Sequence, residues 1–335
     1  MKKLLTLTLA AVLAVGSVQA DTTTLNASGA TFPAPIYGRW FAEYGKLHSD
    51  VHINYQSVGS GTGIKNFTDG LTDFGASDAA MSDDEIKKVT GGVLLLPMTA
   101  GSIVLSYNLP GLTAAVKLPR DVYPAIFLGE IKKWNDPKLQ AANPGVKLPD
   151  LPISVAYRSD GSGTTYNFTS HLAAISADFK AKVGSGKQVK FPVGVGGKGN
   201  EGVAAQIKGI KGSIGYIEYG YAVQIKLPMA ELQNSAGKFV APTPESGSAA
   251  LGQVELPANL RAFVTDPAGD ASYPIVTFTW WLCHPEYTKP GAAATIKSLA
   301  AWSLTDGQKL APSLGYLPLP ASVVTKVQAA VDQIK

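Results

Sequence analysis

The sequence predicts an α/β protein that folds as two lobes, joined by a two-stranded hinge, with a ligand cleft between the lobes. Strand and helix patterns alternate along most of the chain, which is typical of α/β sheets. The chain has 335 residues, and this length suits two hydrophobic cores better than one. Two long apolar strand patterns, near residues 103 and 276, are placed to cross between the lobes. We therefore assign residues 21–102 and 273–335 to lobe I and residues 103–272 to lobe II.

The first 20 residues have the pattern of a secretory signal peptide. Two lysines precede an apolar run from Leu4 to Val15, and small residues lead to an expected cleavage point after Ala20. No cysteine lies near this point to carry a lipid anchor, and no later apolar run reaches the roughly 18 to 20 residues that a membrane span needs. We therefore expect a mature chain that begins at Asp21 and is exported as a free, soluble protein.

Strand and helix patterns follow one another along the mature chain, with breaks at glycine and proline. Short apolar or alternating runs predict strands at residues 22–28, 51–56, 71–78, 93–96, 103–107, 153–156, 213–218 and 273–283. Helical patterns predict helices at residues 36–44, 64–67, 119–128, 166–174, 201–207, 246–253, 292–302 and 322–334. A capping box at residues 82–85 begins a further short helix. Residues 132–151 are predicted to be a proline-rich connection, and most of residues 226–270 are weakly patterned.

Three connections between a strand and a helix consist largely of small residues. They lie at residues 29–35, 57–63 and 159–165. A helix start leaves backbone N–H groups without an intrahelical partner, and the helix dipole adds partial positive charge, so each connection can bind an anion. Asp78 ends another short strand, and ligands of open α/β sheets bind outside the carboxyl ends of the strands. We expect these segments to face one site, although Asp78 could instead cap the turn that follows it.

The central connection, at residues 159–165, also carries charge. Arg158 precedes it and offers a planar, permanently charged group to an anion. Asp160 lies two residues further along the same extended segment, where it can hold the guanidinium group and partly neutralise it. The alternative interpretation is a glycine-rich turn whose charges are solvated. A fourth glycine-rich turn, at residues 194–200, precedes another predicted helix.

The charge of the chain does not indicate a nucleic-acid or membrane-surface partner. The formal net charge is +4, and it falls to +2 when the two lysines of the signal peptide are removed. Proteins that bind such polyanionic partners have clustered basic residues, whereas those of this chain are scattered. Any anion should therefore be bound by local dipoles rather than by a charged surface.

Cysteine and histidine give no sign of a metal or a cofactor. Cys283 is the single cysteine, so no intramolecular disulfide can form, and its apolar neighbours predict a buried strand position. His48 and His52 have the spacing of a helical metal pair, but the residues between them begin an extended run and no third ligand is evident. We expect neither a bound metal nor a cofactor.

Three enzyme-like functions share parts of this pattern. A nucleotide-binding P-loop needs Ser or Thr after Lys198, but Gly199 follows it. A serine hydrolase could use Ser77, whose surroundings approach a nucleophile elbow, yet none of the four histidines is placed as its base. A metal-dependent phosphatase needs clustered His and Asp ligands that the sequence does not have. Binding needs only donors, one proton acceptor and a hinge, so we expect a binding protein and not an enzyme.

The mature chain resembles the PstS family, the periplasmic phosphate-binding proteins of high-affinity phosphate ABC importers. The likeness covers nearly the whole mature chain and is most specific in the segments GATFPAP at 29–35, DFGASD at 73–78, R-x-DGSGT at 158–164 and GGKGN at 196–200, followed by GYIEY at 215–219. The resemblance implies the type II periplasmic binding protein fold, which has two α/β lobes and a hinge.

The resemblance also implies a set of site residues. Phosphate would be held by Thr31, Phe32, Ser60, Asp78, Arg158, Ser162, Gly163 and Thr164. Asp160 would brace Arg158. The family often has two successive serines in the second turn, where this chain has Ser60 and Thr62 around a glycine, so either residue could supply the hydroxyl group.

The same resemblance implies a role and partners. The protein would be a periplasmic monomer that binds inorganic phosphate and delivers it to an inner-membrane ABC permease with its ATPase subunits, without a nucleic-acid partner. A buried carboxylate repels an oxyanion that has no proton to offer and accepts a hydrogen bond from one that has. We therefore expect Asp78 to exclude sulfate.

Overall fold

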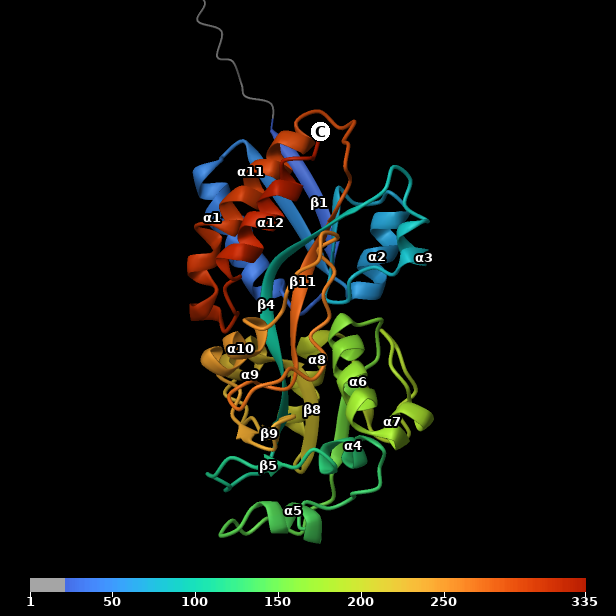
Figure 1. Ribbon diagram of the computed structural model, residues 1–335, viewed down its shortest axis with the longest axis vertical. Coiled ribbons are helices and arrows are strands. Elements are labelled where there is room, and N and C mark those ends of the chain that lie inside the picture. Colours follow the sequence, from blue (N-terminus) through green and yellow to red (C-terminus); the bar gives the residue numbers. More distant parts are fainter. Residues whose placement is uncertain (1–21) are drawn as a thin grey trace, which may run out of the picture.

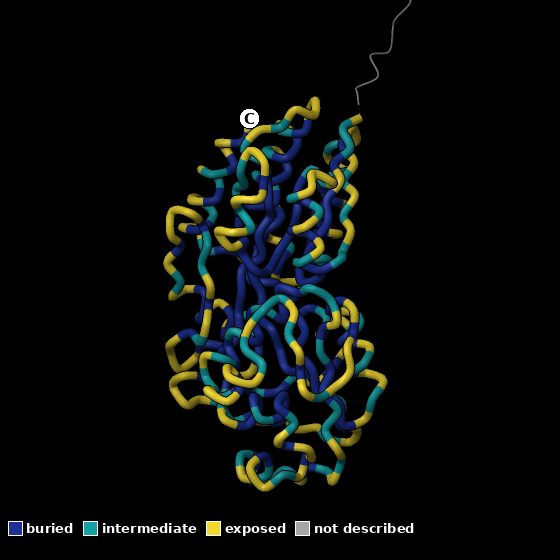
Figure 2. The backbone as a smooth tube through the Cα atoms, turned by 90° about the vertical axis from the view of Figure 1, so that its right-hand side faces the viewer, coloured by how far each residue is buried: buried dark blue, intermediate teal, exposed yellow. Residues whose placement is uncertain are grey.

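The computed structural model describes residues 22–335, so the expected signal peptide lies outside the described residues. The molecule is elongated, and Figure 1 shows an upper half, with β1, α1, α2, α11 and α12, and a lower half, with α4 to α9. Figure 2 shows buried segments that continue through the middle of the molecule from one half to the other. No helix in residues 22–335 has the length and apolar character to cross a membrane.

The strands agree closely with the sequence prediction in the upper half. Their bounds are β1 Thr23–Gly29, β2 Val51–Ser57, β3 Phe74–Ser77, β4 Leu94–Tyr107, β5 Lys117–Leu118, β6 Ser154–Arg158, β7 Val195–Gly197, β8 Ser213–Glu218, β9 Glu231–Gln233, β10 Phe239–Val240 and β11 Val276–Cys283. The short strands β5, β9 and β10 form a separate small sheet. Four strands, β5, β7, β9 and β10, are too short for a periodic pattern and were not expected.

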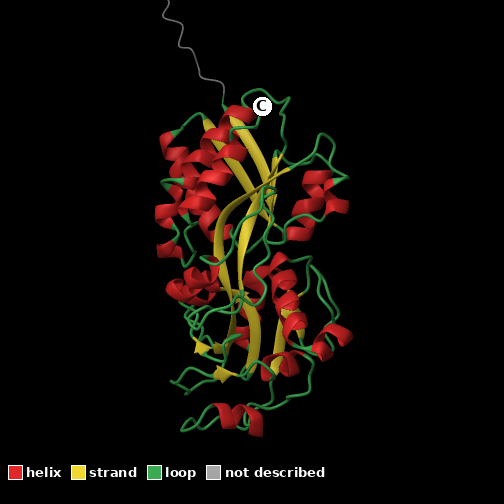
Figure 3. Cartoon of the chain, in the orientation of Figure 1, coloured by secondary structure: helices red, strands yellow, loops and turns green. Residues whose placement is uncertain are grey.

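The helices cover both faces of the strands (Figure 3). Their bounds are α1 Ala34–Leu47, α2 Ser60–Thr68, α3 Asp83–Ile86, α4 Val122–Phe127, α5 Pro137–Ala142, α6 Gly163–Ile175, α7 Ala177–Lys182, α8 Gly199–Gly209, α9 Tyr219–Gln224, α10 Pro244–Leu251, α11 Ala292–Leu304 and α12 Ala321–Val331, with 3-10 turns η1 Gly307–Leu310 and η2 Pro312–Leu314. The expected capping box is confirmed at the start of α3, where Ser82 and Glu85 bond each other's backbone N–H groups. The short helix α5 lies inside the segment that was expected to be only a connection.

One eight-stranded sheet runs through both halves in the order β2-β1-β3-β11-β4-β8-β6-β7. Strands β1, β2 and β3 are parallel in the upper half, and β6, β7 and β8 are parallel in the lower half. Strands β4 and β11 are antiparallel to each other and lie between these two groups. The alternating strands and helices thus form the mixed α/β architecture that the sequence predicts.

Strand β4 corrects the prediction of two separate strands at 93–96 and 103–107. It is continuous, pairs with β11 through Ser102 and pairs with β8 from Ile103 onward. Pro97 falls inside it at a β-bulge, where the register shifts between Thr279 and Trp280 of β11. A bulge tolerates proline because one residue there is free of the hydrogen-bond ladder. The strand therefore passes from one half to the other without a break.

The start of α2 corrects the expected turn at 57–63. The helix begins at Ser60 instead of Ile64, so the connection is short and ends at Gly59, whose φ is 91°. Gly63 lies inside the helix against β1, and a Cβ atom on it would stand 2.4 Å from the Cα atom of Gly29. The glycines of this segment therefore allow close packing of the helix on the strand, and they bring the helix N-terminus to the sheet edge.

A second connection joins the halves outside the sheet. Leu256 accepts a hydrogen bond of 2.6 Å from Lys326 of α12, and Arg261 forms an ion pair of 2.7 Å with Asp83 in the upper half. A few residues later, Asp266 accepts a hydrogen bond of 2.6 Å from Arg120 of the lower half. Residues 252–266 therefore form a strap between the halves.

Candidate anion-binding site

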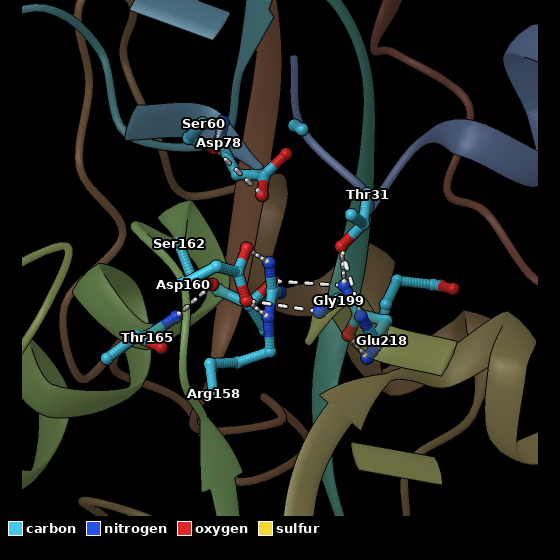
Figure 4. Close-up of polar contacts among 12 residues, drawn as sticks. Thr31, Ser60, Asp78, Arg158, Asp160, Ser162, Thr165, Gly199 and Glu218 are labelled. Atoms are coloured by element: carbon cyan, nitrogen blue, oxygen red, sulfur yellow. Dashed lines mark hydrogen bonds and ion pairs between the residues drawn. The ribbon is translucent and has the colours of Figure 1, made fainter. Parts of the chain in front are cut away.

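The starts of three helices meet where the two halves face each other. Helix α1 follows β1, α2 follows β2 and α6 follows β6, so each helix begins at the carboxyl end of a strand. The helix N-termini carry unpaired N–H groups and a partial positive charge. Figure 4 shows the side chains of Thr31, Asp78 and Arg158 pointing toward a common centre between these helix starts. The structure thus brings together the three connections that the sequence singled out.

Arg158 supplies the positive charge of this cluster. It ends β6, and only 3% of its surface is exposed. Its Nε atom donates to Asp160 Oδ1 at 2.8 Å, and its Nη2 atom donates to Asp160 Oδ2 at 2.6 Å, which is the forked geometry expected from the sequence. Gly199 also donates its backbone N–H to Asp160 Oδ1, at 3.0 Å. Asp160 therefore holds one edge of the guanidinium group and leaves Nη1 on the side of the site.

The charge of Asp160 is secured by these contacts. Burial raises the pKa of its carboxyl group, but the hydrogen bonds and the charge of Arg158, together with the N–H of Gly199, outweigh burial and lower the pKa overall. The carboxylate is therefore ionised and permanently paired with the guanidinium group. The ion pair is neutral as a whole, and Arg158 still offers N–H donors to the site through Nη1.

Asp78 is the carboxylate on the opposite side. It follows β3, is 1% exposed, and accepts a hydrogen bond of 3.0 Å from Thr279 Oγ1. Burial raises the pKa of Asp78 to about 7, because it outweighs the hydrogen bonds from Thr279 and Ser60 and the charge of Arg158. A proton placed near Asp78 can therefore be shared with it close to neutral pH.

Ser60 lies directly beside Asp78. Its hydroxyl oxygen accepts the backbone N–H of Asp78 at 3.2 Å, and its Oγ atom lies 3.5 Å from Asp78 Oδ2. Ser60 is 1% exposed, whereas Thr62, two residues further along α2, is exposed. The geometry favours Ser60 over Thr62 as the hydroxyl group of this turn.

Ser162, Gly163 and Thr164 form the start of α6. Ser162 caps the helix, since its hydroxyl oxygen accepts the backbone N–H of Thr165 at 3.0 Å. Thr164 Oγ1 accepts a hydrogen bond of 3.3 Å from Arg158 Nη1. The hydroxyl oxygens of Ser162 and Thr164 therefore act as acceptors within the protein, and their protons remain available to an anion.

Thr31 and Phe32 lie before α1 in the upper half. The backbone carbonyl of Thr31 accepts a hydrogen bond of 2.7 Å from the hydroxyl group of Tyr221 in the lower half. Phe32 is fully buried, and its carbonyl accepts a hydrogen bond of 2.6 Å from Tyr316. Its ring packs on β4 at Gly101, where a Cβ atom would stand 2.8 Å from the ring. This turn is therefore held rigidly at the point where β4 passes between the halves.

Direct contacts close the two halves over the site. Gly61 donates its N–H to the carbonyl of Gly161 at 2.9 Å, and Asn167 Nδ2 donates to the carbonyl of Asp78 at 2.7 Å. A Cβ atom on Gly163 would stand 2.6 Å from Ser60 Oγ. The site is thus enclosed by residues of both halves, and only small residues fit at its edge.

Two residues of the cluster were not assigned a role from the sequence. Asn200 donates from Nδ2 to Thr31 Oγ1 at 2.8 Å, and Thr279 bonds Asp78 from β11. Asn200 ends the glycine-rich segment 196–200, which the sequence marks as a turn. Its role is not visible there, because its partner Thr31 is 169 positions away in the sequence. Thr279 lies in an apolar strand pattern, which gives no signal of a polar role.

The chemistry of this cluster suits binding of a tetrahedral oxyanion. It offers hydroxyl groups, helix N-termini and one guanidinium group as donors, with Asp78 as an acceptor. Within residues 22–335, no group of three or more His, Cys, Asp or Glu is arranged to hold a metal ion. The cluster can bind and enclose a ligand with its own side chains and backbone.

The fold and the site define a two-lobed ligand-binding protein. A family model described as the PBP superfamily domain matches residues 16–306. The solved structure of a phosphate-binding protein from Stenotrophomonas maltophilia has the same fold, with a TM-score of 0.75 at 20% identity, over 92% of this chain and 93% of that chain.

Curated relatives narrow this class to one family. The phosphate-binding protein PstS of Pasteurella multocida is 43% identical over 309 residues, which cover 91% of this chain and 89% of the relative. The phosphate-binding protein PstS of Xylella fastidiosa is 41% identical over 317 residues, which cover 93% of this chain and 85% of the relative. The chain belongs to the PstS family of phosphate-binding proteins.

Proposed function

We propose that this chain binds inorganic phosphate between its two halves and delivers it to an ABC transporter for import. The observation that carries the proposal is the placement of Asp78, a proton acceptor, opposite the donors around Arg158 in one enclosed cluster. The names of the curated relatives support the same ligand. The site would bind and release phosphate without converting it chemically.

We propose the same ligand-binding residues that the sequence indicates. Backbone N–H groups at the three helix starts and the neighbouring hydroxyl groups would surround the phosphate oxygens. Asp160 would brace Arg158 without touching the ligand. The proposed set is Thr31, Phe32, Ser60, Asp78, Arg158, Ser162, Gly163 and Thr164.

Selectivity for phosphate would come from Asp78. Near neutral pH, phosphate keeps at least one proton, and a P–OH group can donate a hydrogen bond to the buried carboxylate. Sulfate has no proton at this pH, so its oxygen and the carboxylate would face each other as two acceptors. Because both are enclosed, the repulsion costs several kcal/mol and is not relieved by water.

The two halves would move as lobes when phosphate enters or leaves. We retain residues 21–102 and 273–335 as lobe I and residues 103–272 as lobe II, with β4 and the chain before β11 as the hinge. The lobes would separate at contacts such as the hydrogen bond between Gly61 and Gly161. The strap at 252–266 would follow this motion because it is anchored in both halves.

The place of action and the partners extend the same proposal. The protein would be exported by cleavage after Ala20 and would work as a periplasmic monomer. It would hand phosphate to an inner-membrane permease that is driven by its ATPase subunits. This assignment is supported by the family and by the leader pattern of the sequence.

Calorimetric titration of the purified mature chain with phosphate and with sulfate tests the proposed function. Phosphate should bind with a Kd in the micromolar range or below, and sulfate should not bind measurably. If phosphate does not bind with a Kd below roughly 1 mM, the proposal is refuted, because this value is the weak end of specific affinity.

A further inference from the structure

Asn200 joins the two halves at the back of the binding cluster. It is the second residue of α8, it is fully buried, and its side chain spans between the upper-half turn at Thr31 and the lower-half helix start at Thr164. Its partners lie 169 and 36 positions away in the sequence. The amide group therefore contacts one hydroxyl group from each half.

The hydroxyl group of Thr31 is forced to act as a donor. Its oxygen accepts two hydrogen bonds from Asn200, one from the backbone N–H at 3.1 Å and one from Nδ2 at 2.8 Å. A hydroxyl oxygen has two lone pairs and one proton, so both acceptor positions are occupied. Within residues 22–335, Thr31 Oγ1 donates to no protein acceptor. Its proton is therefore left for a group at the centre of the cluster.

Thr164 is held in the same way. Its hydroxyl oxygen accepts a hydrogen bond from Arg158 Nη1 at 3.3 Å and another from Asn200 Nδ2 at 3.3 Å. Two donors occupy both lone pairs, and the proton again points to the remaining side. The amide group of Asn200 thus turns a hydroxyl group of each half into a donor.

The orientation of the amide group is set by a backbone donor. Asn200 Oδ1 accepts the backbone N–H of Glu218 at 2.9 Å. An N–H group can only donate, so the oxygen of the amide must face Glu218 and the nitrogen must face the two threonines. The direction of the hydrogen bonds therefore runs from Glu218 through Asn200 to Thr31 and Thr164, and each bond supports the polarity of the next.

We propose that Asn200 is a positioning residue that directs the hydroxyl protons of Thr31 and Thr164 toward the bound oxyanion and ties the two halves together in the closed state. The proposal rests on phosphate as the ligand of the site. It differs from a packing role because it depends on the direction of the hydrogen bonds and not on the shape of the side chain. Binding should therefore respond to reversal of the amide polarity at constant shape.

The variant Asn200→Asp reverses the polarity with almost no change in shape. Its carboxylate keeps an acceptor for Glu218 and replaces the NH₂ donor with a second acceptor, toward which the threonine hydroxyl groups would turn. We expect the Kd for phosphate to rise about 100-fold, the effect of two misdirected hydrogen bonds. Asn200→Ala should cost only about 10-fold, since the backbone N–H at this position still donates to Thr31.

A double-mutant cycle with Thr31→Val separates polarity from simple charge repulsion. In the wild-type background, loss of this hydroxyl group should raise the Kd about 10-fold. In the Asn200→Asp background it should change the Kd less than about 2-fold, because the hydroxyl group already points away from the ligand. An equal effect of Thr31→Val in both backgrounds would overturn the proposal, since repulsion by a new carboxylate is independent of Thr31.

Two controls keep the outcome clear. If the wild-type protein does not bind phosphate, the proposed function itself is refuted. If the wild-type protein binds phosphate and the effects of the two substitutions are additive, the role of Asn200 is refuted. If Asn200→Asp does not fold by thermal melting, the cycle is run with Asn200→Ala and Thr164→Val, because Asn200 is the second of two donors to Thr164. A smaller effect of Thr164→Val in the Asn200→Ala background supports the proposal, and an equal effect overturns it.

Discussion

Gly163, the first residue of α6, lies against Asp78 at the end of β3, and a Cβ atom on Gly163 would stand 2.8 Å from Asp78 Oδ2. Gly163 belongs to the lower half of the molecule and Asp78 to the upper half. The closed arrangement therefore requires the absence of a side chain at this position. The contact places the start of α6 within reach of any ligand that Asp78 binds.

Gly163→Ala should weaken phosphate binding without loss of the fold. The added methyl group cannot fit between Ser60 and Asp78 when the halves are closed, whereas an open protein can accommodate it. We expect the Kd to rise about 5- to 150-fold, corresponding to a cost of about 1 to 3 kcal/mol for overpacking. Titration calorimetry measures the change.

Gly38→Ala is the matched control for that variant. Gly38 lies in α1, and a Cβ atom there would meet nothing within 4 Å. Alanine in an exposed helix should leave the Kd unchanged and raise stability by about 0.5 to 1 kcal/mol. Equal affinity of Gly163→Ala and wild type would show that closure leaves more room at α6 than the structure indicates.

Arg158→Ala should weaken binding but not abolish it. Arg158 is the buried cation of the cluster, and the loss of its charge-assisted hydrogen bonds should cost about 1 to 3 kcal/mol, while the neutral donors at the helix starts remain. The Kd for phosphate, measured by calorimetry, gives the change directly. Arg39→Ala is the control, since Arg39 forms an exposed pair with Glu43 on α1 and should not affect the Kd. An unchanged Kd for Arg158→Ala would remove Arg158 from the site.

Much of the site could be predicted because its parts are local in sequence. Each helix start follows a strand within a few residues, so the small residues of the connections mark it, and the fork between Arg158 and Asp160 needs a separation of only two residues. The alternating elements also predicted the α/β architecture, and burial of Cys283 at the end of β11 followed from its apolar neighbours.

The remaining features depend on contacts between distant segments. Thr279 reaches Asp78 across 201 positions, and Asn200 reaches Thr31 across 169 positions, so no local pattern marks either residue. The continuity of β4 was hidden by Pro97, which is unusual inside a strand and is tolerated here because β4 itself has a bulge at this point. The strap at 252–266 forms no helix or strand. It is anchored by buried apolar side chains such as Leu256 and Leu260 and by the ion pair of Arg261, whose partners lie far away in the sequence.

Phosphate should make the protein more compact. Contacts between the halves, such as the ion pair between Glu85 of α3 and Lys187, are made in the closed arrangement and would break when the lobes separate. Small-angle scattering should give a smaller radius of gyration with phosphate than without it, and sulfate should leave the radius unchanged. Equal radii with and without phosphate would argue for a rigid receptor.

The stability of the ligand-free protein should depend on the ionisation of Asp78. Its pKa is raised from 3.8 to about 7 by burial, so the folded protein binds this proton more tightly than the unfolded chain. The contribution of Asp78 to the free energy of unfolding is therefore most favourable below pH 4. It decreases as the pH rises toward 7 and is constant above that. The full decrease is on the order of 4 kcal/mol in the closed arrangement.

Asp78→Asn isolates this contribution from that of other groups. The free energy of unfolding, measured with urea in phosphate-free buffer, should favour the variant over wild type more strongly at pH 8 than at pH 5. Burial raises the pKa of Glu218, and the charge of Asp78 raises it further, so the difference between the two proteins reports the titration of Asp78 together with its coupling to Glu218. A difference that does not change with pH would show that Asp78 is solvated in the ligand-free protein.

The selectivity of the site should also change in Asp78→Asn. The amide group keeps the shape of the side chain, but it can donate as well as accept, so an oxyanion without a proton no longer meets two opposed acceptors. The variant should still bind phosphate and should gain measurable binding of sulfate. A site whose buried polar groups are left unpaired by the wrong ligand can discriminate by roughly 10⁴ to 10⁵, so even partial loss of selectivity is measurable.

Competition between labelled phosphate and unlabelled sulfate measures this selectivity in both proteins. Thr279→Val serves as the comparison, because it removes the hydrogen bond of 3.0 Å to Asp78 Oδ1 but leaves the carboxylate in place. Thr279→Val should continue to reject sulfate, since the repelling oxygen remains. If Asp78→Asn rejects sulfate as strictly as the wild type does, the carboxylate is a structural cap for the turn after β3, and the donors around Arg158 must carry the selectivity.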